Sequence, residues 1–515
     1  MTLQAKENRT GVPARPDARQ TGAMFLVSLL ICAVWFSVVC SANIRFDTDR
    51  MFYSAETAVS QYQRENRSGL AFLLNLFTGG GWDPVLNGAL FLLFFVLSCW
   101  ILWLYLIRFT EGKWRPVWYL LFTLLYGTSP VWAFQFYFSL QAAPVGFGIM
   151  LAAAFAGTDV RMHTGEAPKP AALALWEAAA FLCTCFLTVI YQSLIIYYAA
   201  AAAMLLFCRL AHGTRCRVSM ILLWAARIVL ALAAYVMMTH LAPGGQSGYL
   251  SGQIQWGKQP VLTCLSNILV EFGKTLLMVH SSHFSLYLPG VILLAVFLVR
   301  RKREGNGDRW IWLLLTAAAL VLLPMAMSIF QASRPVPRTQ FALQVISAFL
   351  IVFFAAECIS GQRAVRAVRI VCFAAVIIQA VLVLRLGYTD NRRNQWDLNA
   401  AERITQDIRE KGLEDQPLVF TGTLPFEDDT ILMEKTDVFG LSMFEWSYDP
   451  EKPCSATSGA VRLLSAANGK AYKAKSYQKI LNEIRETAEQ MARFPEDGYI
   501  RPMDGYVIIR LPEEP

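Results

Sequence analysis

Two carboxylates stand one residue apart in residues 41–53, SANIRFDTDRMFY. Asp47 and Asp49 are flanked by Arg45 and Arg50, and they follow an apolar run of about 20 residues, long enough to cross a bilayer. A carboxylate at the mouth of a membrane helix is wet on one side and shielded on the other. That setting can raise its pKa and make it a general base toward a hydroxyl group. Its neighbour would then contact a sugar hydroxyl or a metal ion.

The same two residues also allow a structural interpretation. They can be solvated loop charges, or caps of a helix whose apolar residues follow at helical spacing. These residues are Phe52, Ala55, Val59 and Tyr62. For catalysis we prefer Asp49 as the base, because it adjoins Arg50 and begins that helix, and Asp47 as the sugar or metal contact.

Further polar and aromatic residues fall at the ends of other apolar runs. QASRPVPRTQ places Arg334 and Arg338 in a turn bounded by prolines, which suits holding a phosphate at a membrane surface. Interfacial arginines can also simply extend their charge into water. VIYQSLIIYY places Tyr191 and Gln192 at another corner, and Trp132 begins an aromatic cluster. Such rings stack on sugars, or form the aromatic belt of a membrane protein.

Composition fixes the environment of these residues. The 515 residues are 55% hydrophobic and 16% charged, and the mean hydropathy is +0.40, so the chain is a polytopic membrane protein. The net charge of +8 lies in short clusters between apolar runs, as in cytoplasmic loops, and does not indicate nucleic acid. Walker, GxGxxG and HExxH motifs are absent from the sequence.

The apolar runs predict about 11 transmembrane helices. Lys and Arg gather on one side of these runs, which places the N-terminus in the cytoplasm and the acid pair on the outer face. The runs are centred near Val34, Leu97, Leu124, Met150, Phe181, Ala200, Leu230, Leu293, Ala319, Phe349 and Val376.

The segment from Val261 to Val279 is apolar but carries Glu271 and Lys274. A crossing there would move the basic cluster at 300–303 to the outer face, so we expect either an amphipathic helix along the outer interface or a buried core helix.

The domain organisation follows from these spans and from the change in composition after the last one. We expect a disordered cytoplasmic tail at 1–20 and a transmembrane domain at 21–388. Its outer loops are 44–83 and 241–284, and a small extracytoplasmic α/β domain occupies 389–515. That domain should contain helices at 398–411 and 477–491 and strands at 417–422 and 505–511.

Four stretches, in this order, resemble the multi-spanning Gtr-type glucosyltransferases that decorate bacterial O-antigen and related surface polysaccharides. They are FDTDRMFY, YQSLIIYYAAAAAMLL, FGLSMFEWSYD and FPEDGYIRPMDGYVIIRL. The resemblance implies a GT-C membrane fold, a polyprenyl-phosphate sugar as donor, and a lipid-linked glycan or surface polymer as acceptor. It places the enzyme in the inner (plasma) membrane, with a donor synthase and a flippase as candidate partners.

The resemblance also assigns roles to the residues above. Asp47 or Asp49 would be the base, and Arg45, Arg50, Arg334 and Arg338 are the phosphate candidates. Tyr191, Gln192 and Trp132 are candidate sugar contacts. The sequence requires no cofactor, although Asp47 could hold a divalent metal. A polysaccharide or lipid-linked sugar flippase, or a scaffold acting through its outer domain, are the alternatives; a flippase should show cavity-lining charges within its spans.

Overall fold

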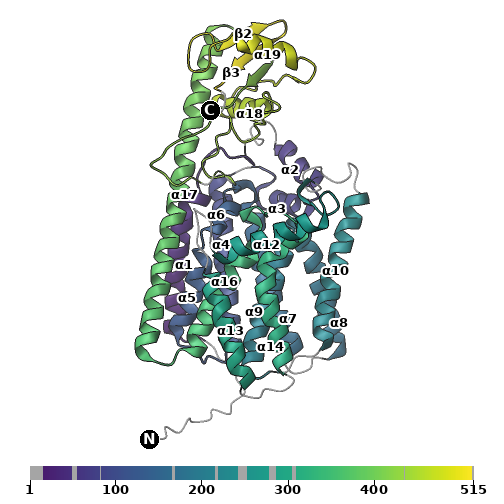
Figure 1. Cartoon of the computed structure of the whole chain (residues 1–515), viewed down its shortest axis with the longest axis vertical. Helices are drawn as coiled ribbons and strands as arrows, with labels where there is room; N and C mark the ends of the chain where they lie inside the picture. Colours follow the sequence, from purple (N-terminus) through teal and green to yellow (C-terminus); the bar gives the residue numbers. More distant parts are fainter. Residues whose placement is uncertain are drawn as a thin grey trace.

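The computed structural model describes residues 16–48, 55–81, 83–164, 169–214, 218–241, 252–277, 286–303, 309–433, 435 and 437–512. A bundle of long helices carries a small α/β domain at one end (Figure 1). Asp49 and Arg50 lie outside the described residues, as do residues 1–15 of the predicted tail; helix α1 already begins at Ala18.

Polar caps and prolines start several of the apolar helices. Asp17 and Gln20 form a reciprocal capping box at the start of α1. The Asp83 carboxylate accepts hydrogen bonds from the first amides of α4, whose first residue is Pro84. These signals position the first residues of each helix, and the apolar side chains that follow form the bundle.

The helices of the bundle follow one another along the chain, interrupted by short 3₁₀ turns. They are α1 (Ala18–Val39), α2 (Ala55–Arg64), α3 (Ser68–Thr78), α4 (Pro84–Phe109), α5 (Pro116–Gly127), α6 (Val131–Phe136), α7 (Ser139–Thr164), α8 (Pro170–Ile190), α9 (Ser193–Ala211), α10 (Val218–Leu241), α12 (Val261–Leu277), α13 (Tyr287–Arg303), α14 (Arg309–Leu322), η2 (Leu323–Met325), α15 (Ala326–Gln331), η3 (Pro337–Thr339), α16 (Phe341–Cys358) and α17 (Gln362–Glu410).

All eleven predicted span centres lie in helices. Within the described residues, nine helices are long and apolar enough to cross a membrane. Helices α5 and α13 are shorter, with 12 and 17 residues. The predicted fold class, an α-helical polytopic membrane protein with a small C-terminal α/β domain, is confirmed, and the number of crossings stays a prediction.

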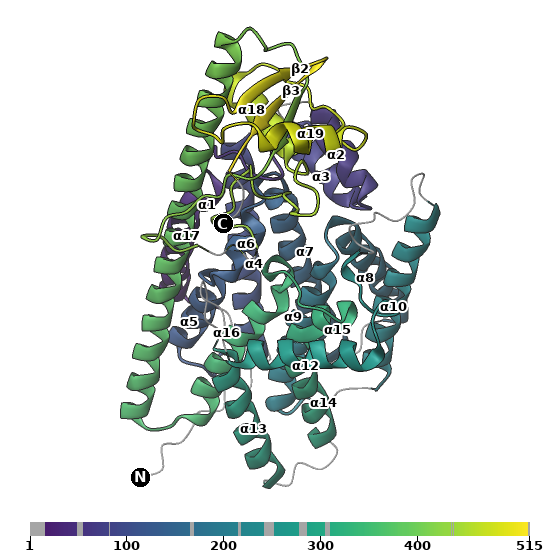
Figure 2. The same cartoon turned by 45° about the horizontal axis from the view of Figure 1, so that its top comes forward.

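Helix α12 covers the ambiguous apolar segment. It runs across the bundle rather than along it (Figure 2). Leu262, Leu265 and Leu269 are exposed, whereas Glu271 is buried and pairs with Lys274 at 2.8 Å. The exposed leucines exclude a buried core helix and fit the expected interfacial one.

Helix α17 joins the bundle to the C-terminal domain without a break. Its 49 residues include the last span and all of the predicted helix 398–411 except Lys411, which caps it, so the predicted boundary at 389 falls inside one helix. The domain adds α18 (Thr457–Asn468), α19 (Leu481–Glu489) and a three-stranded sheet of order β1-β3-β2. The strands are β1 (Leu418–Thr421), β2 (Ile500–Met503) and β3 (Tyr506–Arg510), with β1 parallel and β2 antiparallel to β3.

Candidate active site

A cavity of about 350 Å³ lies where the segment between α1 and α4 meets the C-terminal domain. Its volume is within the range typical of small-molecule sites. Segments far apart in the sequence form its wall: the turn after α1, the α2–α3 corner, the start of α7, the end of α8, the turn before α16, and one residue of the C-terminal domain. The lining residues are Phe46, Asp47, Gln61, Tyr62, Glu65, Arg67, Phe138, Gln141, Tyr191, Arg338 and Trp446.

Asp47 is held in this wall by the start of α7. One of its carboxylate oxygens accepts a hydrogen bond from the Leu140 amide at 2.8 Å, and only 8% of the residue is exposed. An amide at a helix N-terminus has no partner within the helix, and the helix dipole there favours a negative charge. Asp47 therefore has a fixed orientation at the edge of the cavity.

Arg67 lies at the corner between α2 and α3 and is 9% exposed. Its guanidinium is 5.0 Å from the centre of the Tyr191 ring, and its Nη1 lies 3.4 Å from the Gln141 amide oxygen and 3.5 Å from the Glu65 carboxylate. Its Nε has no hydrogen-bond partner among the described residues. A buried guanidinium N–H without a partner is costly, and an anion in the cavity would satisfy it.

Arg338 faces the cavity from the turn before α16. It forms an ion pair with Asp437 of the C-terminal domain, and its guanidinium stacks 5.0 Å from the centre of the Phe138 ring. Together with Arg67 it brings two fork-shaped cations into one cavity with Asp47. Such a set suits a phosphate beside a carboxylate.

The family comparison now bears on this geometry. The family model of glucosyl transferase GtrII matches residues 36–355, more than half of the chain and including every lining residue except Trp446. This chain belongs to the GtrII glucosyltransferase family. The resemblance predicted from the sequence motifs is confirmed, and the GtrII chain is a membrane glycosyltransferase.

Other comparisons add little to the GtrII assignment. Among solved structures, the archaeal oligosaccharyltransferase AglB from Archaeoglobus fulgidus, in complex with an inhibitory peptide and a dolichol-phosphate, is similar with a TM-score of 0.41 and 10% identity. The likeness covers 90% of this chain and 65% of that one, and it is too distant to carry an argument. No curated protein matches the chain.

Of the residues predicted from the sequence, the GtrII cavity brings together Asp47, Tyr191 and Arg338. The other predicted residues that the structure describes do not line it. Arg45 is fully buried in an ion pair with Asp390, and Arg334 is exposed. Trp132 is in the aromatic core, where its indole N–H donates to the Tyr126 carbonyl at 3.0 Å, and Gln192 donates to the Tyr235 hydroxyl at 2.7 Å.

Sequence reasoning missed several GtrII cavity residues. Arg67 was visible as a charge in a long outer loop, and Trp446 lies in the motif FGLSMFEWSYD, but nothing in either segment shows that they face Asp47. Tyr62 and Gln141 line the cavity because of tertiary packing, which their local sequence does not indicate. Burial, and then the charge of Asp47, raise the pKa of Tyr62 well above its ordinary value, so its hydroxyl stays protonated and can donate.

A buried charge network lies beside the cavity. Asp390 of α17 accepts from Arg45 at 2.8 Å and from Arg393 at 2.6 Å, and Arg393 also donates to Asp397 at 3.0 Å. Arg393 further donates to the Ile44 carbonyl at 2.9 Å. The turn that carries Asp47 is therefore attached to α17 by both arginines.

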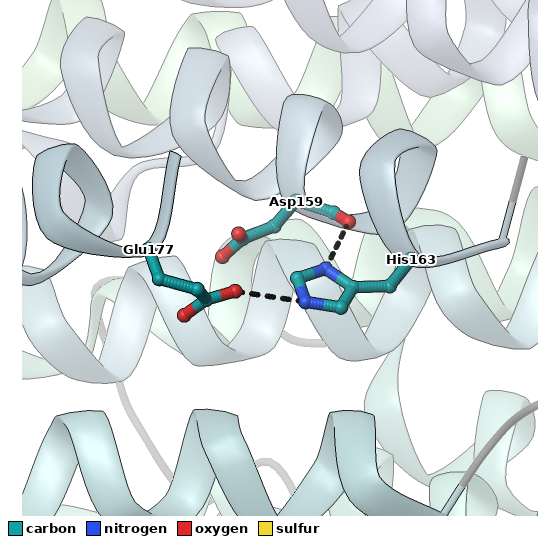
Figure 3. Close-up of side chains that lie close together, drawn as sticks. All are labelled: Asp159, His163 and Glu177. Carbon is teal, nitrogen blue, oxygen red and sulfur yellow. Dashed lines mark hydrogen bonds and ion pairs between the residues drawn. The ribbon is translucent and has the colours of Figure 1, made fainter. Parts of the chain in front are cut away.

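A second polar cluster lies within the bundle. Asp159, His163 and Glu177 have ligand atoms close enough to hold a metal, and His163 contacts both the Asp159 carbonyl and the Glu177 carboxylate (Figure 3). However, Arg227 lies 3.0 Å from Asp159, which also accepts from the Trp176 indole at 2.7 Å. The arginine already supplies the positive charge that these acids need. We therefore assign the cluster to packing between α7, α8 and α10.

Proposed function

We propose that this chain transfers glucose from a polyprenyl-phosphate donor to a lipid-linked glycan or surface polysaccharide at the outer face of the plasma membrane. The observation that carries the proposal is the cavity that joins Asp47 to Arg67 and Arg338 between the bundle and the C-terminal domain. Family membership supports the sugar and the reaction type. In this orientation the N-terminus is cytoplasmic and the C-terminal domain extracytoplasmic, as the grouped lysines and arginines support.

The donor phosphate would bind between the two arginines. A lipid-phosphate donor keeps its leaving group in the bilayer, so the enzyme needs phosphate contacts at the membrane surface and no nucleotide-binding domain. Among the described residues, the Arg67 Nε beside the cavity has no hydrogen-bond partner, and Arg338 lies at the start of a span. Both can neutralise the charge that develops on the leaving phosphate oxygen. We propose Arg67 as a phosphate contact together with Arg338.

The acid pair would activate the acceptor. As the acceptor oxygen attacks C1 of the donor sugar, its proton passes to a carboxylate and the C1–O bond electrons pass to the phosphate oxygen. We keep Asp49 as the proposed base. Asp47, oriented by the Leu140 amide, is the proposed contact to a sugar hydroxyl, and the protonated Tyr62 can donate to another.

A reconstituted transfer assay tests the proposal. Purified protein in nanodiscs receives synthetic polyprenyl-phosphate glucose and oligosaccharides taken from the surface glycan of cells that lack this chain. We expect polyprenyl phosphate to be released and the acceptor mass to rise by one hexose. The same protein is also reconstituted into vesicles. Movement of the intact donor across the vesicle membrane, without release of polyprenyl phosphate, would instead show a flippase and contradict the proposal.

A further inference from the structure

Trp446 is an exposed aromatic side chain in the wall of the cavity. It belongs to the C-terminal domain, yet its ring stacks on Phe46 with centroids 4.1 Å apart and planes at 16°. The tryptophan is 40% exposed, whereas Phe46 is buried. Phe46 directly precedes Asp47, so the C-terminal domain places a flat apolar surface next to Asp47.

Buried polar contacts hold that surface in place. The turn that carries Trp446 is attached to Asp397 of α17, which accepts from the Ser442 hydroxyl at 2.6 Å and from the Met443 amide at 3.0 Å. Asp397 pairs with Arg393, and Arg393 donates to the carbonyl of Ile44, two residues before Phe46. Both rings are thus fixed by neighbouring side chains of one helix. Pre-organised aromatic surfaces are efficient binding elements because little freedom is lost when a ligand arrives.

From this arrangement we propose that Trp446 is the platform on which the acceptor sugar stacks, so that the C-terminal domain selects the acceptor. The inference rests on the proposed glycosyl transfer. The apolar face of a sugar ring fits against an indole, and the polar groups of Asp47 and Gln61 lie in the same wall to meet its hydroxyls.

The position of Trp446 favours the acceptor over the donor. Arg67 and Arg338, the proposed phosphate contacts, belong to the bundle, whose spans would cross the bilayer that holds the lipid of the proposed donor. Trp446 belongs to the domain beyond the end of the bundle (Figure 1), on the side from which a hydrophilic glycan arrives.

Steady-state kinetics of Trp446→Ala test the assignment in the transfer assay. We expect KM for the acceptor to rise about tenfold, since an aromatic contact contributes about that factor, with KM for the donor within about twofold. Trp446→Phe retains a ring on Phe46 and should give a smaller rise. Trp396→Ala is the matched control, because Trp396 is also exposed but packs near Phe426 and does not line the cavity. An unchanged acceptor KM in Trp446→Ala, or an equal rise for the donor, would overturn the proposal.

Binding without donor separates this inference from the proposed function. Acceptor oligosaccharides, with no donor present, should change the tryptophan fluorescence of the wild type and of Trp396→Phe but not that of Trp446→Phe, with thermal melting in detergent confirming that each variant is folded. If the wild type binds the acceptor in this way but transfers no sugar, the proposed reaction fails and the platform stands. If Trp446→Phe gives the full wild-type fluorescence change, the platform fails.

Discussion

Arg67 and Arg338 line the same cavity but differ in the charges that already surround them. Arg338 is paired with Asp437, whose side chain is fully buried, so its removal would disturb the C-terminal domain as well as the cavity. Arg67 has a weaker set of polar contacts, at 3.4 and 3.5 Å, and its Nε has no hydrogen-bond partner in the part of the chain that the structure describes. Substitution of Arg67 should therefore test phosphate binding without also breaking an ion pair to the C-terminal domain.

Arg67→Gln should raise KM for the polyprenyl-phosphate donor about 10- to 100-fold, because a charged hydrogen bond to phosphate contributes about 1.5–3 kcal/mol. Arg64→Gln is the control: Arg64 is an exposed arginine three residues earlier, in the last turn of α2. Initial rates at varied donor concentration measure both. Equal donor KM values for the two variants would remove Arg67 from the phosphate site.

The acid pair gives a second prediction at this scale. Asp49→Asn should lower kcat about 100-fold or more, because the amide keeps the size but cannot accept the proton. Asp47→Asn should lose less activity. Sugar transfer by the purified variants, with melting in detergent to verify folding, measures both effects. Near-normal transfer by both would mean that FDTDR is only a charged loop.

At the scale of elements, α17 organises the site without lining it. Arg393 is 1% exposed and pairs with two acids of its own helix, whereas its neighbour Arg392 is 48% exposed in a looser pair with Asp428 at 3.6 Å. Neighbouring arginines on one helix thus have very different environments. Breaking a buried pair leaves uncompensated charge, while an exposed pair contributes little.

Arg393→Gln should therefore destabilise the protein by about 3–5 kcal/mol, and Arg392→Gln by about 1 kcal/mol or less. Thermal melting of both variants in the same detergent shows the order, and Arg393→Gln should also lose transfer activity because the turn bearing Asp47 loses its attachment. Similar melting temperatures would show that the network is not required for folding.

Hydrophobicity and charge predicted much of this architecture, and tertiary contacts account for the remainder. The helices of the bundle could be predicted because long apolar runs with few charges are typical of membrane-spanning helices. The predicted domain boundary at 389 marks a change of composition, because the surroundings of the chain change there, and the helix continues through it. Gly387 lies within this helix and does not end it. A Cβ at that position would lie 3.1 Å from Ser37 on α1, so the glycine permits close packing of the two helices.

The candidate site was only partly predictable for the same reason. Trp132 and Trp446 are both tryptophans near helix or turn ends, and only packing decides that the first is buried in the core while the second faces the cavity. Likewise Asp390, the ion-pair partner of Arg45, lies 345 residues away along the chain. The sequence therefore does not reveal that the Arg45 guanidinium is neutralised by a carboxylate of the protein.

At the scale of the whole molecule, the basic cluster at 300–303 and the C-terminal domain lie at opposite ends of the bundle. Helix α13 ends in the cluster Arg300–Arg303, away from the C-terminal domain (Figure 2). The positive-inside rule then predicts that the C-terminal domain faces outward.

Cysteine labelling tests that orientation. A membrane-impermeant maleimide on intact cells should label Ser476→Cys, an exposed position of the C-terminal domain, and should label Gly361→Cys, just before α17, only after permeabilisation. A Cβ at Gly361 meets nothing within 4 Å, so the cysteine fits there without a clash. The reverse labelling pattern would invert the topology.

The continuity of α17 has a consequence for insertions and deletions. With 49 residues it is about 74 Å long, and each added residue lengthens it by about 1.5 Å and turns everything beyond it by about 100°. One residue inserted before Asp390 would rotate Asp390, Arg393 and Asp397 together away from the turn after α1, and would separate Trp446 from Phe46 while leaving the C-terminal domain itself intact. The length of this helix is thus constrained in rotation and in axial position, because a full extra turn would still move these three residues about 5.4 Å along the axis. Homologues should therefore keep the length of α17 before Asp390 unchanged.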